Sequence, residues 1–288
     1  MLRVEDMDVL GLCPETRYTR QPSKASQVLR AIRDDAEQGV ALDIAAESDA
    51  NAACRIVAAA TRQSRQRAYA LAHRVYRRSG YARDEGTGLC LSPFDAIDQT
   101  LTLLAENADG QATATLSLVF DSNEGLPCDE IYRPEVDALR ARGCRLAEVT
   151  RLAIEEPCAD AKSLLLRMFN YCYIFSRFIR GCTDLVIEVN PSHVKYYRRL
   201  LLFTQVGPER RCSRVQGAPA VLLRLNLAEI EAAVKGSGFT EGRDSSGNRL
   251  HAYPYSEAEE AAIAESLARQ HRPMSAEEAR YFGLQRQS

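Results

Sequence analysis

The chain lacks several features that would place it in a common class. Its 288 residues carry 37 basic and 39 acidic side chains, a formal net charge of −2, so the charge balance predicts no nucleic-acid partner. Apolar runs stay well short of the ~20 residues that a membrane-spanning helix needs. The N-terminal segment MLRVEDMDVL contains acids and no long apolar core, unlike a signal peptide. We therefore expect a cytoplasmic protein without a membrane span.

Metal-binding and disulfide patterns are missing as well. Nine cysteines are scattered without a C-x-x-C pair, and only four histidines accompany them, so we predict no zinc or other metal site. An odd number of unclustered cysteines is typical of reduced thiols in a cytosolic protein. With 45% hydrophobic residues, the chain is long enough for one large domain with extensions or for two modest domains.

Hydrophobic periodicity predicts alternating helices and strands. Two period-two segments that flank a turn, 99–104 and 112–120, predict a hairpin. Further strands are expected at 146–154 and 184–189, with a final strand pair at 203–206 and 220–225. Helices are expected at 24–38, 61–79, 134–142, 160–179 and 191–202. This order predicts an α/β fold with a mixed sheet covered on both faces.

We expect three regions along the chain. Residues 1–60 form an N-terminal arm with one helix, and residues 61–235 form the main domain. Residues 236–288 begin with a Gly/Ser-rich linker and end with two helices, each opened by a serine that is followed three residues later by an acid. These tail helices serve either as peripheral packing or as a lid.

The most informative segment is Leu146–Ile154, LAEVTRLAI, which predicts a nearly apolar strand with an acid and a base three residues apart. Such a strand is covered on both faces, so Glu148 and Arg151 would be charges in a covered place. Either they form a structural ion pair or they belong to a site, and the cost of burying charge favours a site. Strict alternation places them on opposite faces, so they share one site only if the strand is bulged or if they line different walls.

The order of elements resembles the Gcn5-related N-acyltransferase (GNAT) fold, and three motifs narrow the resemblance. EVTRLAI at 148–154 resembles the fourth-strand signature of acyl-homoserine-lactone synthases. GLPCDEIY at 125–132 and EVNPSHVKYYRRLL at 188–201 resemble the FeeM-type long-chain N-acyl amino acid synthases. Those enzymes are GNAT relatives that join a fatty acyl group from acyl carrier protein to an amino acid. The resemblance runs from about residue 64 to residue 227.

The resemblance implies transfer of a long-chain acyl group from acyl carrier protein to the α-amine of an amino acid. Acyl-phosphopantetheine would be a co-substrate, no cofactor would be bound permanently, and the product would be membrane-active. CoA-dependent relatives hold pyrophosphate on an R/Q-x-x-G-x-G/A loop, whereas residues 155–160 read EEPCAD. This acidic loop should repel pyrophosphate, which agrees with a carrier-protein donor. A CoA-dependent N-acetyltransferase and a non-catalytic acyl-binding or regulatory protein stay as alternatives.

The resemblance also implies catalytic roles. Glu148 is the candidate base that takes a proton from the amino acid's ammonium group, because a covered carboxylate has a raised pKa. Arg151 would bind the amino acid's carboxylate or hold Glu148 in place. A tyrosine on the helix after the fifth strand often protonates the leaving thiolate in GNAT enzymes, so Tyr196 and Tyr197 are candidate acids. Packing of that helix on the sheet is their alternative role.

The remaining candidates surround this strand and helix. The candidate substrate contacts are Thr150, Leu152, Ala153, Asn190 and His193. A backbone N–H near 152–154 is the candidate oxyanion donor. Asn190 is most simply a helix cap, and His193 is a base, a substrate contact or a cap partner.

A basic patch on the same helix is the candidate docking site for acyl carrier protein. It consists of Lys195, Arg198 and Arg199, with arginines at 210, 211 and 214 as further members. An ordinary solvated surface is the alternative. The aromatic side chains of 160–179 either line an acyl trough or pack the core. Relatives carry Leu-Gly-Phe where this chain has Leu201, Leu202 and Phe203, so we expect a different backbone in that turn.

Overall fold

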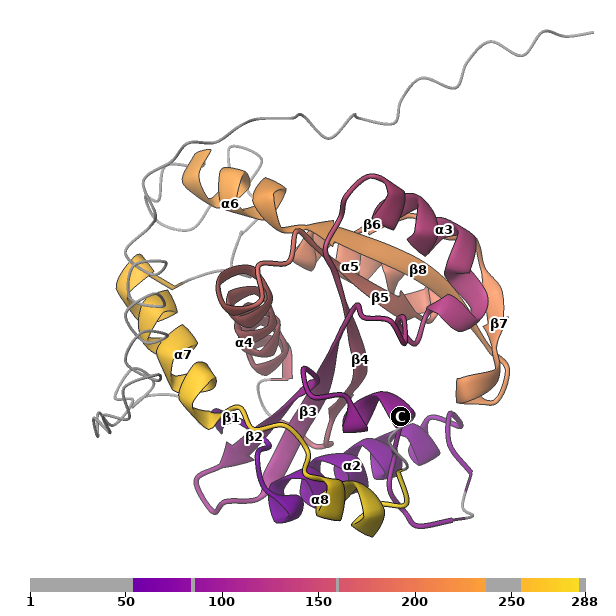
Figure 1. Cartoon of the computed structure of the whole chain (residues 1–288), viewed down its shortest axis with the longest axis vertical. Helices are drawn as coiled ribbons and strands as arrows, with labels where there is room; N and C mark the ends of the chain where they lie inside the picture. The colour runs from indigo at the N-terminus through magenta and orange to yellow at the C-terminus, as the bar shows by residue number, and fades with distance from the viewer. Residues whose placement is uncertain (1–53, 84–85, 159–160, 237–254, 285–288) are drawn as a thin grey trace, which may run out of the picture.

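The computed structural model describes residues 54–83, 86–158, 161–236 and 255–284 (Figure 1). Its centre is a mixed sheet of eight strands in the order β1-β2-β3-β4-β5-β8-β6, with β7 paired to β8. The strands are β1 (Cys54–Ala58), β2 (Leu101–Asn107), β3 (Ala112–Phe120), β4 (Leu146–Ile154), β5 (Asp184–Val189), β6 (Thr204–Gln205), β7 (Arg210–Cys212) and β8 (Ala218–Asn226). Paired strands are antiparallel except β4 and β5, which are parallel.

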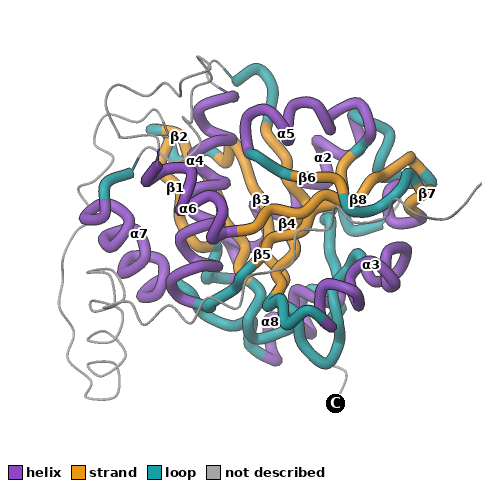
Figure 2. Tube along the Cα trace, turned by 90° about the horizontal axis from the view of Figure 1, so that it is seen from above, coloured by secondary structure: helices purple, strands orange, loops and turns teal. Residues whose placement is uncertain are grey.

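Helices cover both faces of the sheet, as the sequence predicted (Figure 2). On one face, α4 (Ala161–Ile174) and α7 (Glu257–Gln270) pack into the largest apolar cluster. The other face is covered by α2 (Arg62–Arg78) with α8 (Ala276–Tyr281), and by α3 (Asp129–Ala141). The helix α5 (Val194–Leu201) follows β5, and α6 (Leu227–Gly236) follows β8. No helix in the described ranges is long and apolar enough to cross a bilayer.

Periodicity located most elements correctly. The predicted hairpin is β2–β3, and the predicted helix at 61–79 is α2. Both tail helices are present, and each begins with a capping box. Of the two roles considered for the tail, the described helices adopt packing: Ile263 and Leu267 of α7 are buried in the largest cluster, and Phe282 after α8 packs edge-on against Tyr69.

Several boundaries differ from the prediction. The helix α3 begins at Asp129, five residues before the expected start at 134, and it continues through Pro134 with a break at Tyr132, where φ is −125°. The long helix at 160–179 ends its regular part at Ile174 and continues as a π-helical turn over Phe175–Ile179. The predicted helix at 24–38 lies outside the described residues, as does the predicted Gly/Ser-rich linker at 236–250 except for its first residue.

The strand β1 was missed because it is short and lies in the region assigned to the N-terminal arm. Its five residues, CRIVA, are too few for a period-two pattern to stand out in the sequence. It pairs with β2 at the edge of the sheet. The tail secures it, since the backbone N–H of Ala58 donates to the side-chain Oε1 of Gln270 at 3.0 Å.

The turn after α5 keeps a conformation that favours glycine. Leu202 has φ of 60° and ψ of 21°, in the left-handed region, and its side chain is 37% exposed. Its backbone N–H donates to the carbonyl of Tyr197, which closes the helix end as a left-handed cap does. The position at which relatives carry glycine therefore has a left-handed backbone in this chain, with leucine in the cap.

The strand β4 carries the feature that positions the site. It pairs with β5 only over Leu146–Val149 and then continues to Ile154 without it. Its register against β3 also shifts: Ser117 faces Thr150 whereas Thr115 faces Ala153. The extra residue forms a β-bulge, and Arg151 within it has φ of 54°. The strand therefore departs from strict alternation at the point where it leaves its parallel neighbour.

Candidate active site

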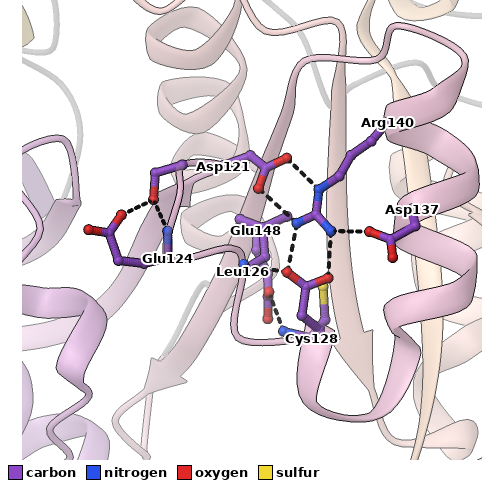
Figure 3. A network of polar contacts seen from close by, with 9 residues as sticks. Asp121, Glu124, Leu126, Cys128, Asp137, Arg140 and Glu148 are labelled. Carbon is purple, nitrogen blue, oxygen red and sulfur yellow. Dashed lines mark hydrogen bonds and ion pairs between the residues drawn. The ribbon is translucent and has the colours of Figure 1, made fainter.

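The Glu148 side chain is buried beneath the start of α3, with 1% of its surface exposed. One carboxylate oxygen, Oε2, accepts the backbone N–H of Cys128 at 2.7 Å (Figure 3). Burial, assisted by the nearby negative charge of Glu188, raises the pKa of Glu148 to about 8, against the opposing effect of hydrogen bonds from Cys128. Glu148 is therefore a carboxyl group that exchanges a proton near neutral pH.

The loop that presents Cys128 to Glu148 is fixed by an ion-pair network around Arg140. This guanidinium bonds Asp121 at the end of β3 and Asp129 at the start of α3, with N···O distances of 2.6–2.8 Å, and also Asp137 (Figure 3). Asp129 in turn accepts the backbone N–H of Leu126 at 2.8 Å. The network fixes both ends of the loop, so the donor to Glu148 is held in place.

A glycine is required in this loop. Gly125 has φ of 75°, and a Cβ atom there would lie 2.4 Å from Oδ2 of Asp129. The sequence pointed to GLPCDEIY only through a resemblance, and neither the glycine nor Arg140 was identified as part of the site. Their role depends on tertiary contacts with Asp121 and Glu148, for which a single sequence gives no signal.

A second carboxylate lies on the neighbouring strand. Glu188 of β5 has 10% of its side chain exposed and bonds Arg214 through Oε2, with an N···O distance of 2.5 Å. Arg214 also pairs with Glu130 of α3 at 2.9 Å. Burial raises the pKa of Glu188, and the Arg214 guanidinium opposes that rise. Arg214 therefore belongs to this buried cluster, not to a free basic patch, and Arg210 likewise pairs with Glu135 at 2.6 Å.

Arg151 binds Asp95 and does not pair with Glu148. Both terminal nitrogens of its guanidinium bond the Asp95 carboxylate, and one of them also bonds Ser117 Oγ at 2.9 Å. The guanidinium carbon lies 5.3 Å from the centre of the Tyr69 ring. The expected structural ion pair therefore exists with a different acid, and the role of holding Glu148 in place was wrong.

The bulge nevertheless places Arg151 and Glu148 on the same face of the sheet. On β3, Ser117 and Val119 lie two residues apart and so share a face. Arg151 bonds the side chain of Ser117, whereas Glu148 is the register partner of Val119. The bulged strand, one of the two arrangements considered from the sequence, is the one that the chain adopts.

The two candidate tyrosines on α5 have different surroundings. Tyr197 is buried, and its ring packs edge-on against Phe169 and Phe203, each with centroids 5.9 Å away. Tyr196 is half-buried at the edge of this cluster. Burial raises the pKa of both phenols, so both remain protonated near neutral pH. Only Tyr196 combines a protonated hydroxyl with partial exposure.

Asn190 acts as the predicted helix cap, because its Oδ1 accepts the backbone N–H of Ser192 at 3.0 Å. Its Nδ2 lies 3.3 Å from the hydroxyl of Tyr81, a contact that the sequence did not suggest. His193 is exposed. Asn190 thus joins the end of β5 to the segment after α2.

The other expected substrate contacts lie on the part of β4 that has left β5. Thr150 and Leu152 are half-buried, and Leu152 packs against the apolar cluster that includes α4. Ala153 is buried against Leu71 and Ala72 of α2. Beyond the bulge, consecutive residues of β4 therefore contact opposite layers of the fold.

Most arginines of α2 are held in ion pairs. Arg65 is buried and pairs with Glu278 of α8, while Arg67 pairs with Glu106. Two others, Arg74 and Arg78, both bind Glu155. The acidic loop after β4 therefore has one of its charges balanced from within the chain. Among the described residues, Lys195, Arg198 and Arg199 of α5 are exposed and have no ion-pair partner.

A small polar pocket lies apart from these residues. It is lined by Arg65, Tyr69, Asp95 and His271 among others, and none of the predicted site residues lines it. In the described part of the chain, no group of three His, Cys, Asp or Glu side chains is arranged to hold a metal ion.

Comparisons with known proteins agree with this architecture. The family model described as "N-acyl amino acid synthase FeeM" matches residues 67–226. A search of curated proteins gave no match. Among solved structures, FeeM, an N-acyl amino acid synthase from uncultured soil microbes, is similar with 26% identity and a TM-score of 0.56, over 63% of this chain and 94% of that chain. This likeness confirms the GNAT-type fold that the motifs predicted.

Two further structures are similar at lower identity. The acyl-homoserine lactone synthase LasI has 19% identity and a TM-score of 0.49, over 66% of this chain and 98% of that chain. An N-acetyltransferase from Staphylococcus aureus Mu50 has 12% identity and a TM-score of 0.41, over 62% and 99%.

Proposed function

Because the chain belongs to the FeeM family of N-acyl amino acid synthases, we propose that it moves a long-chain acyl group from acyl carrier protein to an amino acid's α-amine. Membership of this family makes the chain an acyltransferase. The observation that carries the mechanism is Glu148, a buried carboxyl group with a pKa raised to about 8, which lies one residue before the end of the pairing between β4 and β5. We assign Glu148 as the base.

The base is needed because an amino acid arrives as an ammonium ion. The Glu148 carboxylate takes one proton from that ion, directly or through one water, and leaves a neutral amine. The amine nitrogen attacks the thioester carbonyl carbon, and the carbon–sulfur bond breaks as the amide forms. A thioester and an ammonium ion thus give an amide, a thiol and one proton, which Glu148 returns to solvent.

Two further roles complete the proposed mechanism. Tyr196 protonates the leaving thiolate, since it is the more exposed of the two tyrosines and its raised pKa keeps the proton on it. The second proton that the attacking nitrogen loses as the amide forms then restores the Tyr196 phenol. A backbone N–H in 152–154 stabilises the oxyanion, because this part of β4 no longer pairs with β5. The proposed substrate contacts lie on the two segments that diverge there. They are Thr150 on β4, and Asn190 and His193 after β5.

Acyl carrier protein is the proposed donor for two reasons. The described residues after β4, Glu155–Cys158, include no glycine that would expose backbone N–H groups to pyrophosphate, and Glu155 lies there with its carboxylate on Arg74 and Arg78. Carrier proteins are acidic, and α5 presents Lys195, Arg198 and Arg199 at the surface. Opposite charge on two partners accelerates their encounter and orients it.

We also place the reaction in the cytoplasm. The eight cysteines of the described residues are all free thiols. Free thiols suit a reducing compartment.

The test is mass spectrometry of products after incubation with palmitoyl carrier protein and pooled amino acids. An N-palmitoyl amino acid in the carrier reaction, with palmitoyl-CoA a poor donor, is the expected result and names the acceptor. Equal use of palmitoyl-CoA would contradict the assignment of the donor. No product from either donor would favour an acyl-binding protein without turnover.

A further inference from the structure

Two buried carboxylates from adjacent strands share one face of the sheet. Glu148 is the register partner of Val186 across the parallel β4–β5 pair. Glu188 lies two residues beyond Val186 and so projects on the same side. The pairing of β4 with β5 ends at Val149 and Ile187. Glu188 therefore lies one residue beyond the paired part of β5, and Glu148 lies one residue before the end of the paired part of β4.

One oxygen of Glu188 has no partner. Oε2 is bonded by Arg214, but Oε1 is buried and accepts no hydrogen bond from the described residues. The side chain is nine-tenths buried, so water does not readily compensate for the missing bond. A buried carboxylate oxygen without a donor is costly. A ligand that brings an N–H donor would remove that cost.

The charge around this pair is unbalanced. Among the described residues, Arg214 pairs with Glu188 and Glu130, and its charge also lowers the pKa of Glu148, so one cation serves three acidic groups. The other titratable groups that face the pair do not add positive charge. Burial raises the pKa of the Cys128 and Cys212 thiols and of the Tyr132 phenol, so these groups are neutral; Asp129 is paired with Arg140.

We propose that Glu188 and Glu148 together form the subsite for the acceptor's ammonium group, with Oε1 of Glu188 accepting one of its N–H bonds. The inference rests on the proposed function and deepens it. Glu188, paired with Arg214, holds the ammonium, and Glu148 receives the proton that the ammonium loses. Arg214, which is 32% exposed and bridges Glu188 to Glu130 of α3, lies at the solvent side of the subsite.

The variant that tests this is Glu188→Gln, which keeps the size of the side chain and removes its charge. We expect KM for the amino acid to rise about 10- to 100-fold, the effect of losing one charge-assisted hydrogen bond. KM for palmitoyl carrier protein should stay within about twofold, because the acyl donor does not contact Glu188. An unchanged KM for the amino acid would overturn the proposal.

An acceptor that is already neutral separates ammonium binding from a general defect. Hydroxylamine is neutral at neutral pH, so its enzyme-catalysed acylation, corrected for the uncatalysed reaction, should be nearly equal in wild type and Glu188→Gln. A loss as large as that for the amino acid would indicate only structural damage. Glu135→Gln is the matched control, because it removes another α3-side carboxylate from an arginine pair, that with Arg210, and should leave both acceptors unaffected.

A second measurement does not depend on turnover. In protein labelled with ¹³C at glutamate carboxyl carbons, methylammonium chloride should shift the Glu188 signal with saturation, and tetramethylammonium chloride, which has no N–H donor, should not. Equal responses to both salts would contradict the subsite. If wild type acylates no amino acid but shows the selective shift, the proposed function fails and the ammonium subsite stands.

Discussion

At the scale of single residues, the described buried charges differ in how fully their hydrogen-bonding capacity is met. The Arg151 terminal nitrogens are bonded to Asp95, Ser117 and the carbonyl of Cys90. Glu148 and Glu188 share one cation, and one oxygen of Glu188 is unbonded. Arg151 Nε is unbonded as well, but the guanidinium has a counter-ion of its own in Asp95, whereas the two glutamates have one cation between them. A charge with its own counter-ion stabilises the fold, whereas a pair that lacks one is free to bind a cation.

Replacing Glu148 by glutamine should abolish most turnover without unfolding the protein. A positioned general base contributes about 10²–10⁴-fold to rate, and glutamine can still accept the Cys128 N–H. In wild type, kcat/KM should rise with pH until about pH 8, where Glu148 becomes ionised, and then level off. Steady-state rates of wild type and variant across pH test both expectations. Near-normal turnover by the variant would contradict the assignment of Glu148 as the base.

The same residue should make stability depend on pH. The pKa of Glu148 in the folded protein, about 8, lies above the ~4.3 of an unfolded chain, so the folded state binds the proton more tightly. The stability that this difference provides is present in full below about pH 4 and is lost as pH rises to about 8. Denaturation of wild type and Glu148→Gln across this range should show wild type losing stability relative to the variant; parallel curves would contradict the raised pKa.

Removing the charge of Asp95 should destabilise the fold. Asp95→Asn leaves the Arg151 guanidinium buried without its counter-ion, which costs about 3–5 kcal/mol. Asp137→Asn is the control, because Asp137 is 54% exposed on Arg140 and such pairs contribute about 1 kcal/mol or less. Urea unfolding measures both; a small effect at Asp95 would mean that Arg151 finds another partner.

At the scale of elements, hydrophobic periodicity predicted the regular strands and missed the irregular features, a bulge and a helix start. The strands β3 and β5 have the expected bounds, because alternation identifies a pleated surface. The sequence left open whether the strand is bulged at Arg151 or whether the two charges line different walls. A single sequence does not indicate that an arginine will adopt a positive φ. The start of α3 was misplaced because Pro134 usually marks a first turn.

The left-handed cap at Leu202 gives a prediction about α5. Leu202→Gly should raise the free energy of unfolding by about 0.5–1 kcal/mol, because glycine adopts a positive φ without the steric cost that a Cβ imposes. Leu202→Ala removes nearly the same side chain and keeps the Cβ, so it should give no such gain. Thermal unfolding of the two variants distinguishes these outcomes. An equal gain in stability for both would mean that removal of the exposed leucine side chain, and not relief of the positive φ, is the cause.

At the scale of the whole molecule, the fold was predictable and the site only in part. The order of elements and the motifs predicted the GNAT architecture and selected Glu148. They did not reveal Asp95 as the partner of Arg151, or Arg214 as the partner of Glu188, because these contacts join residues 56 and 26 positions apart. Ion pairs between distant segments depend on tertiary packing, which periodicity does not encode.

The surface of α5 gives a prediction about the donor. Reversing charge in Arg198→Glu/Arg199→Glu should raise KM for palmitoyl carrier protein about 10-fold or more and leave KM for the amino acid nearly unchanged, because rim charges govern encounter. Added salt should weaken the wild-type interaction and shrink the difference. Arg280→Glu, an exposed arginine of α8, is the control. An unaffected carrier KM would remove α5 from the docking surface.

The closure of the sheet edge by the tail has a consequence for how the protein is made. Ala58 bonds Gln270, and Arg65 bonds both Arg272 and Glu278, contacts between residues 207 to 213 positions apart. Contacts of such separation form late and slow folding. While the ribosome is still synthesising α7 and α8, β1 and α2 lack these contacts. The nascent chain therefore completes this edge of the sheet only after α7 and α8 have emerged.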